Sequence, residues 1–147
     1  MTNRPSGRTP PPLIGALLRA PWETVRDRML NGLHQRGYDD LVAAHLSVLL
    51  YPGPDGMRPS DIAARMRMSK QAVAYLLGQL EQLDYLTRSA DPDDQRSRRI
   101  WLTPRGHALA ASIREIVGEV EREWTDRLGH RRFGELKEML AELGDAP

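Results

Sequence analysis

Apolar side chains recur at helical spacing near both ends of this chain. From Ile14 they follow at intervals of four, four, three, four and four residues: Ile14, Leu18, Trp22, Val25, Met29 and Leu33. Beyond Pro104 a longer stripe is followed by a shorter one: Leu109, Ile113, Ile116, Val120, Trp124 and Leu128, then Phe133, Leu136, Leu140 and Leu143. Such intervals are typical of amphipathic helices, so we expect helices at both ends of the chain, the first of them started or kinked at Pro21.

The middle of the chain predicts three more helices. The first covers residues 41–51, is almost uniformly apolar, and ends in a turn rich in proline and glycine. The second, over residues 59–66, has proline at its first helical position. After a tight two-residue link, Ser69 is a good N-cap for a third helix whose apolar stripe extends to Leu83.

After that helix the pattern changes to short strands. Residues 85–88 and 100–102 are predicted strands, and the polar stretch 89–99 between them is predicted to be the loop at the tip of a hairpin. Thr103 then provides the N-cap of the long helix that follows. The order of helix, tight turn, helix and hairpin is that of a winged helix-turn-helix, in which the second helix enters the DNA major groove and the hairpin reaches flanking DNA.

The predicted fold is therefore mainly α with a small β-hairpin. Residues 1–12 contain four prolines and almost nothing apolar, so we expect a disordered N-terminal arm. Residues 37–106 are the predicted winged helix-turn-helix DNA-binding domain. Residues 13–36 and 107–147 are a predicted helical dimerisation region, because their apolar faces exceed what the core between them can cover, and a two-fold homodimer would bury the rest.

Composition narrows the possible functions. The 147 residues contain no cysteine, which excludes disulfides, thiolate zinc sites and a cysteine nucleophile. The net charge is only +1, but residues 57–106 hold nine Lys or Arg against six acids, whereas residues 107–147 hold six against nine. The basic surplus thus lies on the predicted DNA-binding elements. There is no apolar run of about 20 residues and no secretory signal, so we expect a cytoplasmic protein without a membrane partner.

The exposed face of the second helix carries polar groups suited to DNA. Hydroxyl, ammonium and amide groups at the start of a reading helix can contact phosphates and base edges. The candidate DNA contacts on this helix are Ser69, Lys70, Gln71, Ala74, Tyr75 and Gln79. The same residue types are common on any solvated helix, so an ordinary surface remains the alternative.

The hairpin adds a cluster of arginines. Three of them fall within four residues, and arginine is attracted to narrow minor grooves. The candidate DNA contacts here are Arg88, Asp94, Arg96, Arg98 and Arg99. Because an aspartate would repel DNA unless it has another role, we expect Asp94 to orient Arg96 through a local ion pair. A solvated charged loop is the alternative.

Three stretches resemble the MarR family, the multiple-antibiotic-resistance-type transcription regulators: residues 58–66, 69–83 and 91–106. The likeness runs from about residue 13 to residue 143 and includes the order of the helices. It implies an obligate homodimer that binds a pseudo-palindromic operator, usually as a repressor, and is released by a small lipophilic or aromatic ligand. In this resemblance Asp94 and Arg96 match the wing positions at which the arginine enters the minor groove.

The chain also departs from the family pattern. Tyr75 stands where a polar or basic residue is frequent, Gln95 replaces a frequent arginine, and Asp84 replaces the glycine that usually ends the reading helix. Asp84 can still end the helix, because aspartate tolerates a left-handed conformation. The operator sequence cannot be transferred from the family.

The resemblance places a ligand in a cleft between the dimer helices and the reading lobe. Residues that could line it are Trp22, His45, Tyr51 and Trp101. Each of them also fits an ordinary packing role, so this interpretation remains open.

No cofactor, metal or enzymatic activity is expected. The four histidines have no metal-ligand spacing, and no nucleophile elbow or glycine-rich phosphate loop is present. Two alternatives remain open: a winged-helix module that binds protein or RNA, and a DNA-binding regulator without ligand control.

Overall fold

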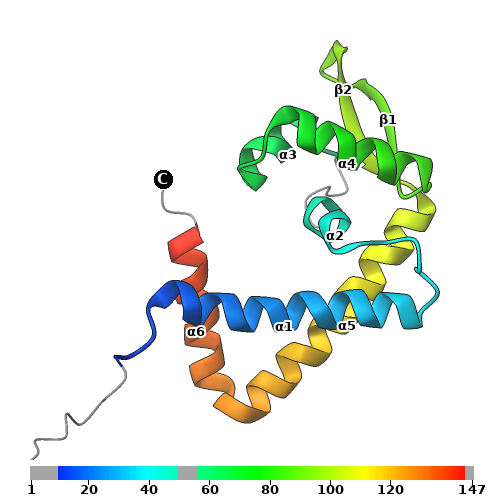
Figure 1. Cartoon of the computed structure of the whole chain (residues 1–147). Helices are drawn as coiled ribbons and strands as arrows, with labels where there is room; N and C mark the ends of the chain where they lie inside the picture. Colours follow the sequence, from blue (N-terminus) through cyan, green and yellow to red (C-terminus); the bar gives the residue numbers. More distant parts are fainter. Residues whose placement is uncertain (1–9, 50–55, 145–147) are drawn as a thin grey trace, which may run out of the picture.

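The computed structural model describes residues 10–49 and 56–144, which form six helices and one two-stranded antiparallel sheet (Figure 1). In chain order the elements are α1 (Ile14–Gln35), α2 (Ala43–Leu49), α3 (Pro59–Met66), α4 (Lys70–Gln82), β1 (Leu86–Asp91), β2 (Asp94–Leu102), α5 (Pro104–Leu128) and α6 (His130–Gly144). This order confirms the predicted mainly α fold with a winged helix-turn-helix.

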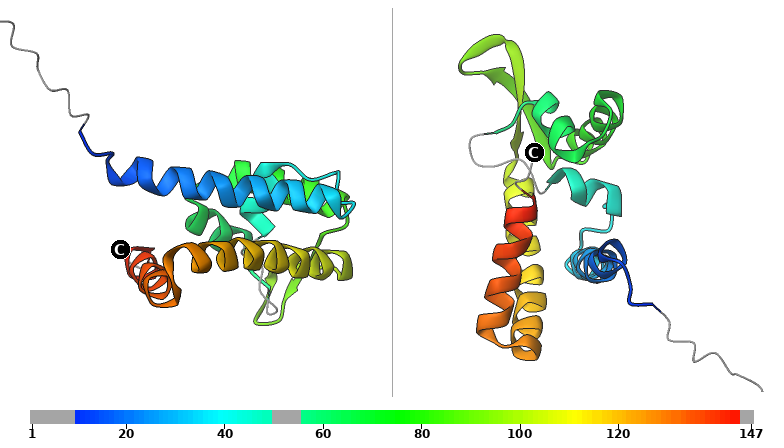
Figure 2. Two further views of the ribbon diagram at one scale, coloured as in Figure 1. Left: turned by 90° about the horizontal axis from the view of Figure 1, so that it is seen from below. Right: turned by 90° about the vertical axis from the view of Figure 1, so that its left-hand side faces the viewer.

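The molecule has two ends with different elements. In Figures 1 and 2 the hairpin and α4 lie at one end, whereas α1 and the corner between α5 and α6 lie at the other. Helix α5 connects the two ends, because it begins directly after β2 and runs down beside α1. None of the helices in the described part of the chain is long and apolar enough to cross a membrane.

Helices α1 and α5 pack closely because a glycine allows it. A Cβ atom at Gly32 would come within 2.8 Å of the side chain of Ile116 on α5. Ion pairs flank this contact: Arg28 lies 2.8 Å from Glu123, and Arg36 lies 3.1 Å from Glu115. These pairs are exposed and contribute little energy individually, so apolar packing holds the two helices together.

One hydrophobic core joins α2, α3, α4 and the hairpin, which together are called the reading lobe, to α1 and α5. Its fully buried members come from α1 to α5, from β2 and from the segments that precede α2 and β1: Met29, Leu33, Leu41, Leu46, Val48, Ile62, Val73, Leu77, Leu80, Tyr85, Ile100 and Leu109. Burial of one such side chain contributes roughly 1.5–3 kcal/mol, and the core is continuous across the two ends of the molecule. The orientation of the reading lobe is therefore fixed by the same core that packs α1 on α5.

The predicted helix boundaries hold where capping residues set them. The Ser69 hydroxyl accepts the N–H of Ala72 at the start of α4, and the Thr103 hydroxyl accepts the N–H of Gly106 at the start of α5. Asp84 follows α4 with a φ of 63°, in the left-handed conformation expected of it. Gly106 is required at its place, because any Cβ there would collide with the carbonyl oxygen of Tyr85.

Three sequence expectations need correction or limits. Helix α1 begins at Ile14 and continues through Pro21, so the proline does not start the helix. The residues around Pro21 are exposed. The helix expected over residues 41–51 begins at Ala43, and its end at Tyr51 lies outside the described residues. Residues 1–9 of the predicted N-terminal arm also lie outside them; residues 10–12 are exposed.

The predicted hairpin loop is the clearest error. Most of residues 89–99 belong to strands, and only Pro92 and Asp93 separate β1 from β2. The strands were missed because their outer halves carry polar side chains on both faces, so the apolar alternation that marks a strand is absent. The wing is consequently a two-stranded ribbon, paired regularly from Leu86 and Leu102 to Ala90 and Arg98.

Candidate nucleic-acid interface

The start of α4 presents polar side chains to solvent. Lys70 and Gln71 are exposed in its first turn, and Ala74 and Tyr75 are exposed one turn later. The opposite face of α4 is buried through Val73, Leu76, Leu77 and Leu80. The helical period therefore fixes which residues face outward, and the outward set contains the predicted contacts Lys70, Gln71, Ala74 and Tyr75.

Ser69 and Gln79 are placed differently from the other candidates. The Ser69 oxygen is engaged in capping α4, which leaves its own O–H free to donate. Gln79 is half-buried, and its amide lies between two protein partners: His45, at 3.0 Å, and the hydroxyl of Tyr75, at 3.1 Å. The predicted role of Gln79 as a direct DNA contact remains a prediction, but the geometry gives its amide other partners in the free protein.

The wing is anchored by a buried carboxylate that the sequence analysis did not single out. Asp91 is fully buried and accepts hydrogen bonds from the Asp93 N–H, at 3.0 Å, and from Arg58 Nε, at 2.7 Å. Arg99 Nε lies 3.1 Å from the same carboxylate. The backbone N–H of Asp93 and then the guanidinium of Arg58 lower the pKa of Asp91 to about 2, so it is ionised at neutral pH. The tip of the wing is thereby tied to the start of α3.

The proposed ion pair between Asp94 and Arg96 is not the interaction found. Asp94 Oδ1 accepts the backbone N–H of Arg96 at 3.1 Å and so shapes the start of β2. Aspartate is suited to this local turn, because its side chain can bond the backbone two residues further on. Asp94 is thus a turn residue that sets the backbone before Arg96, while the Arg96 side chain is exposed.

Ion pairing separates the four candidate arginines of the hairpin. Arg88 pairs with Glu81 on α4, and Arg99 pairs with Asp91 and, at 3.6 Å, with Asp93. Arg96 and Arg98 are exposed, and within residues 10–49 and 56–144 neither has an acidic partner within 4.0 Å. Arg96 and Arg98 are therefore the two hairpin arginines whose charge remains available to another molecule.

Strand register shows which way Arg98 faces. In β2 the residues 98 and 100 share one face, since side chains alternate along a regularly paired strand. Arg96 lies in the register irregularity that follows, where the partner in β2 changes from Arg98 to Asp94. Arg88 lies directly opposite Ile100 in the register and shares that face, and its guanidinium contacts Glu81 of α4. The face of the hairpin with Arg98 is therefore the one turned toward α4.

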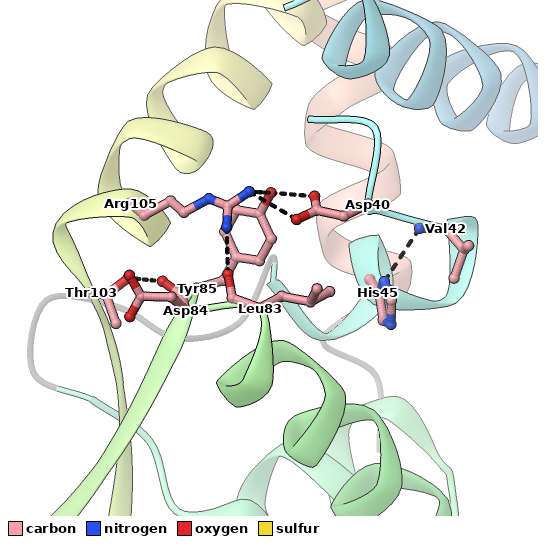
Figure 3. A network of polar contacts seen from close by, with 8 residues as sticks. All are labelled: Asp40, Val42, His45, Leu83, Asp84, Tyr85, Thr103 and Arg105. Carbon is pink, nitrogen blue, oxygen red and sulfur yellow. Dashed lines mark hydrogen bonds and ion pairs between the residues drawn. The ribbon is translucent and has the colours of Figure 1, made fainter. Parts of the chain in front are cut away.

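A polar network holds the reading lobe on α5 (Figure 3). The hydroxyl of the buried Tyr85 donates to Asp40 Oδ1 at 2.6 Å, and Arg105 Nη2 donates to Asp40 Oδ2 at 2.8 Å and to the Tyr85 hydroxyl at 3.0 Å. Arg105 Nη1 also donates to the carbonyl of Leu83 at 2.7 Å. The network joins the segment before α2, the end of α4, the start of β1 and the start of α5.

The network also shifts the titration of its members. Partial burial acts to raise the pKa of Asp40, but the hydrogen bonds from Tyr85 and Arg105 outweigh it and hold the pKa below its usual value. Burial and the hydrogen bond to Asp40 raise the pKa of Tyr85 well above its ordinary value. Asp40 is thus held ionised and Tyr85 neutral at physiological pH.

The candidate ligand residues lie on separate elements. Trp22 is 47% exposed on α1, His45 is buried at the start of α2, and Trp101 is half-buried on β2 beside Gly56. Both ring nitrogens of His45 have protein partners, the N–H of Val42 and the amide of Gln79. Tyr51 lies outside the described residues, so the ligand role of the four remains a prediction.

Comparison with known proteins supports the fold. Residues 41–97, which run from α2 to the wing, match the model of the MarR family. This segment, residues 41–97, belongs to the MarR family. A curated relative of the chain is the exopolysaccharide II synthesis transcriptional activator ExpG of Rhizobium meliloti, 32% identical over 90 residues, which are 61% of this chain and 46% of that protein. The chain thus spans about half the length of that relative.

Solved structures share the fold at low sequence identity. CouR of Rhodococcus jostii, bound to p-coumaroyl-CoA, matches 91% of this chain and 93% of its own with 21% identity and a TM-score of 0.74. A mutant of MepR from S. aureus, bound to an oligodeoxyribonucleotide, matches 90% of this chain and 96% of its own with 24% identity and a TM-score of 0.59. The likeness extends beyond the reading lobe to the terminal helices.

Proposed function

We propose that this MarR-family chain is a transcriptional regulator that binds double-stranded DNA in a sequence-specific manner. The start of α4, with Lys70 and Gln71, enters the major groove, and Arg96 of the wing enters the adjacent minor groove. The observation that carries the proposal is the unpaired, exposed state of Arg96 and Arg98 in the described structure, with Arg98 on the hairpin face turned toward α4. The structural relative MepR, bound to an oligodeoxyribonucleotide, supports this assignment.

The regulator acts as a homodimer joined through residues 13–36 and 107–147. Large apolar side chains are exposed on α1 and α6, more than a monomer usually leaves uncovered: Leu13, Ile14, Leu17, Leu18, Trp22, Met139, Leu140 and Leu143. A hollow of about 490 Å³ between α1, α5 and α6 is lined by Pro21, Trp124, Leu128 and Leu136 among others. A second copy covers these surfaces, and its two-fold symmetry matches a pseudo-palindromic operator read by residues 37–106.

Repression released by a small lipophilic or aromatic ligand is the regulatory mode we assign. A dimer seated on an operator excludes other proteins from that DNA. Binding of a ligand releases it only if the ligand prefers a dimer shape that fits the half-sites poorly. The relative CouR bound to p-coumaroyl-CoA supports an aromatic ligand, whereas ExpG, named as an activator, represents the opposite sign of regulation. Such a regulator works in the cytoplasm and needs no catalytic residues.

Binding to the DNA upstream of its own gene tests the proposal. The wild type is measured at about 150 mM salt with excess nonspecific DNA, beside Arg96→Ala and Arg114→Ala. Arg114 is exposed on α5 outside residues 37–106, so its removal controls for the loss of one arginine charge, and sedimentation checks that this variant still forms the dimer. We expect a Kd below about 10⁻⁷ M, weakened more than about fivefold by Arg96→Ala and less than about twofold by Arg114→Ala.

The opposite pattern refutes the proposal. The protein would then bind all DNA weakly and equally, and Arg96→Ala would not change the affinity. If this held for the upstream region and for duplexes selected from a random pool, a winged-helix module that binds protein or RNA would be favoured. Sedimentation of the same samples measures the dimer independently of DNA.

A further inference from the structure

A buried histidine begins a chain of hydrogen bonds that ends on the exposed face of the reading helix. His45 is the third residue of α2, and its Nδ1 accepts the backbone N–H of Val42, the residue before the helix, at 3.2 Å (Figure 3). In this position it does what Glu or Gln does in a capping box, satisfying an N–H at the start of a helix. Because Nδ1 accepts this bond, the ring proton of the neutral histidine is on Nε2.

The position of that proton determines which atom donates in the hydrogen bond between His45 and Gln79. His45 Nε2 lies 3.0 Å from Gln79 Oε1 on α4, so Nε2–H donates and the amide oxygen accepts. The amide oxygen of Gln79 is thereby turned toward α2, and its nitrogen donates to the hydroxyl oxygen of Tyr75 at 3.1 Å. Every bond in the chain runs in the same direction, an arrangement in which hydrogen bonds strengthen one another.

The direction of the chain determines what the Tyr75 hydroxyl can do. Its oxygen accepts from Gln79, so its own proton is not used in that bond and is available to donate. Tyr75 is 67% exposed and lies one turn beyond Gln71 on the outward face of α4. This series of hydrogen bonds therefore presents an oriented donor at the surface that faces DNA in the proposed complex.

We propose that Tyr75 donates a hydrogen bond to an acceptor on the operator, and that His45 and Gln79 are positioning residues that orient its hydroxyl. This inference rests on the proposed DNA-binding function. The acceptors available in the major groove are the N7 and O6 of guanine, the N7 of adenine and the O4 of thymine, and phosphate oxygens line its edge. Gln79 then acts through Tyr75 instead of touching DNA itself.

A double-mutant cycle tests the inference on an operator that wild-type protein selects from a random duplex pool. Tyr75→Phe removes the donor, and we expect it to weaken operator binding about three- to tenfold, the range of one hydrogen bond. Gln79→Met keeps the size of the side chain but removes both of its hydrogen bonds, and we expect a loss of about two- to fivefold. In the Tyr75→Phe background, Gln79→Met causes no further loss, because its effect passes through the missing hydroxyl.

Two further variants separate positioning from ordinary structural effects. Gln82→Met is the matched control on the same helix, since Gln82 is exposed near its end, and we expect unchanged binding. The glutamine in His45→Gln can still accept the Val42 N–H, but it has no ring Nε2–H to donate to the amide oxygen of Gln79. We expect it to weaken binding as Gln79→Met does, again only when Tyr75 is present.

Each outcome is decisive. Losses that multiply in the double mutants, or a Gln79→Met variant that binds like the wild type, would overturn the inference while leaving DNA binding intact. Failure of the wild type to select any duplex would instead refute the proposed function, and the inference with it. Replacing single purines by their 7-deaza analogues, and single phosphates by methylphosphonates, distinguishes a base acceptor from a phosphate oxygen.

The tautomer of His45 provides a test without DNA. Nitrogen NMR of the free wild-type protein should show His45 protonated on Nε2 and unprotonated on Nδ1. A proton on Nδ1 would break the order of donors on which the orientation of the Tyr75 hydroxyl depends, and would overturn the inference.

Discussion

Removing the hydroxyl of Tyr85 should loosen the junction between the reading lobe and α5. The Tyr85→Phe substitution leaves the ring in the core but deletes one bond donated to Asp40, at 2.6 Å, and one accepted from Arg105, at 3.0 Å. Hydrogen bonds to charged groups contribute about 1.5–3 kcal/mol each when both partners are buried. Here the side chains of Asp40 and Arg105 are 30% and 41% exposed and keep their own 2.8 Å ion pair.

Water and the surviving ion pair therefore compensate for part of the loss. We expect Tyr85→Phe to lower the free energy of unfolding by about 1–2 kcal/mol. For a chain of this size such a change lowers the melting temperature by roughly 2–8 °C. Urea denaturation at a fixed protomer concentration measures the change, because the stability of a dimer depends on its concentration.

Tyr38→Phe is the matched control for this measurement. The Tyr38 ring lies 6.2 Å from the Tyr85 ring, but its hydroxyl has no hydrogen-bond partner among the described residues. We expect Tyr38→Phe to change stability by less than about 0.5 kcal/mol. If the two variants agreed within about 0.3 kcal/mol, the network would contribute nothing specific and the reasoning would be refuted.

Three other outcomes follow from the structure. The pKa of Asp91 is lowered to about 2 from an unfolded value near 3.9, so its ionised form stabilises the fold fully at neutral pH, and this contribution is lost as the pH falls from about 4 to 2. In Asp91→Asn the free energy of unfolding, measured with urea, should depend less on pH over this range. Gly106→Ala should greatly reduce the yield of folded protein because its Cβ meets the Tyr85 carbonyl, whereas Gly15→Ala, with open space around it, should be tolerated in a thermal melt. Leu18→Glu on the exposed apolar face of α1 should shift sedimentation toward the monomer, and an unchanged dimer would show that the subunits meet elsewhere.

Local signals in the sequence predicted most of the fold correctly. The capping roles of Ser69 and Thr103 depend on neighbours within three residues, and the helical stripes repeat within a few turns, so both are visible in a linear chain. The extent of the hairpin was not visible, because the outer parts of both strands are polar and have no core to alternate against. Paired backbones and the anchoring of Asp91 hold these strands together instead.

The site was harder to predict, since its decisive contacts join distant residues. Asp91 meets Arg58 across 33 positions, and His45 meets Gln79 across 34. The aspartate, proline and aspartate of residues 91–93 do indicate a turn in which a carboxylate bonds the backbone, and that pattern could have marked Asp91. Nothing in the sequence indicates that this carboxylate is buried or that Gln79 turns toward α2.

Ion pairing distinguishes arginines that the sequence treats as equivalent, and salt dependence can measure the difference. A guanidinium that contacts DNA releases counterions only to the extent that its charge is not already neutralised within the protein. Arg88 would have to give up Glu81, whereas Arg98 has no acidic partner within residues 10–49 and 56–144. We therefore expect Arg98→Ala to reduce the slope of log Kd against log salt by about one unit, and Arg88→Ala to change it by much less. Equal reductions would show that the pair with Glu81 opens on DNA and that pairing in the free protein does not decide which arginines bind.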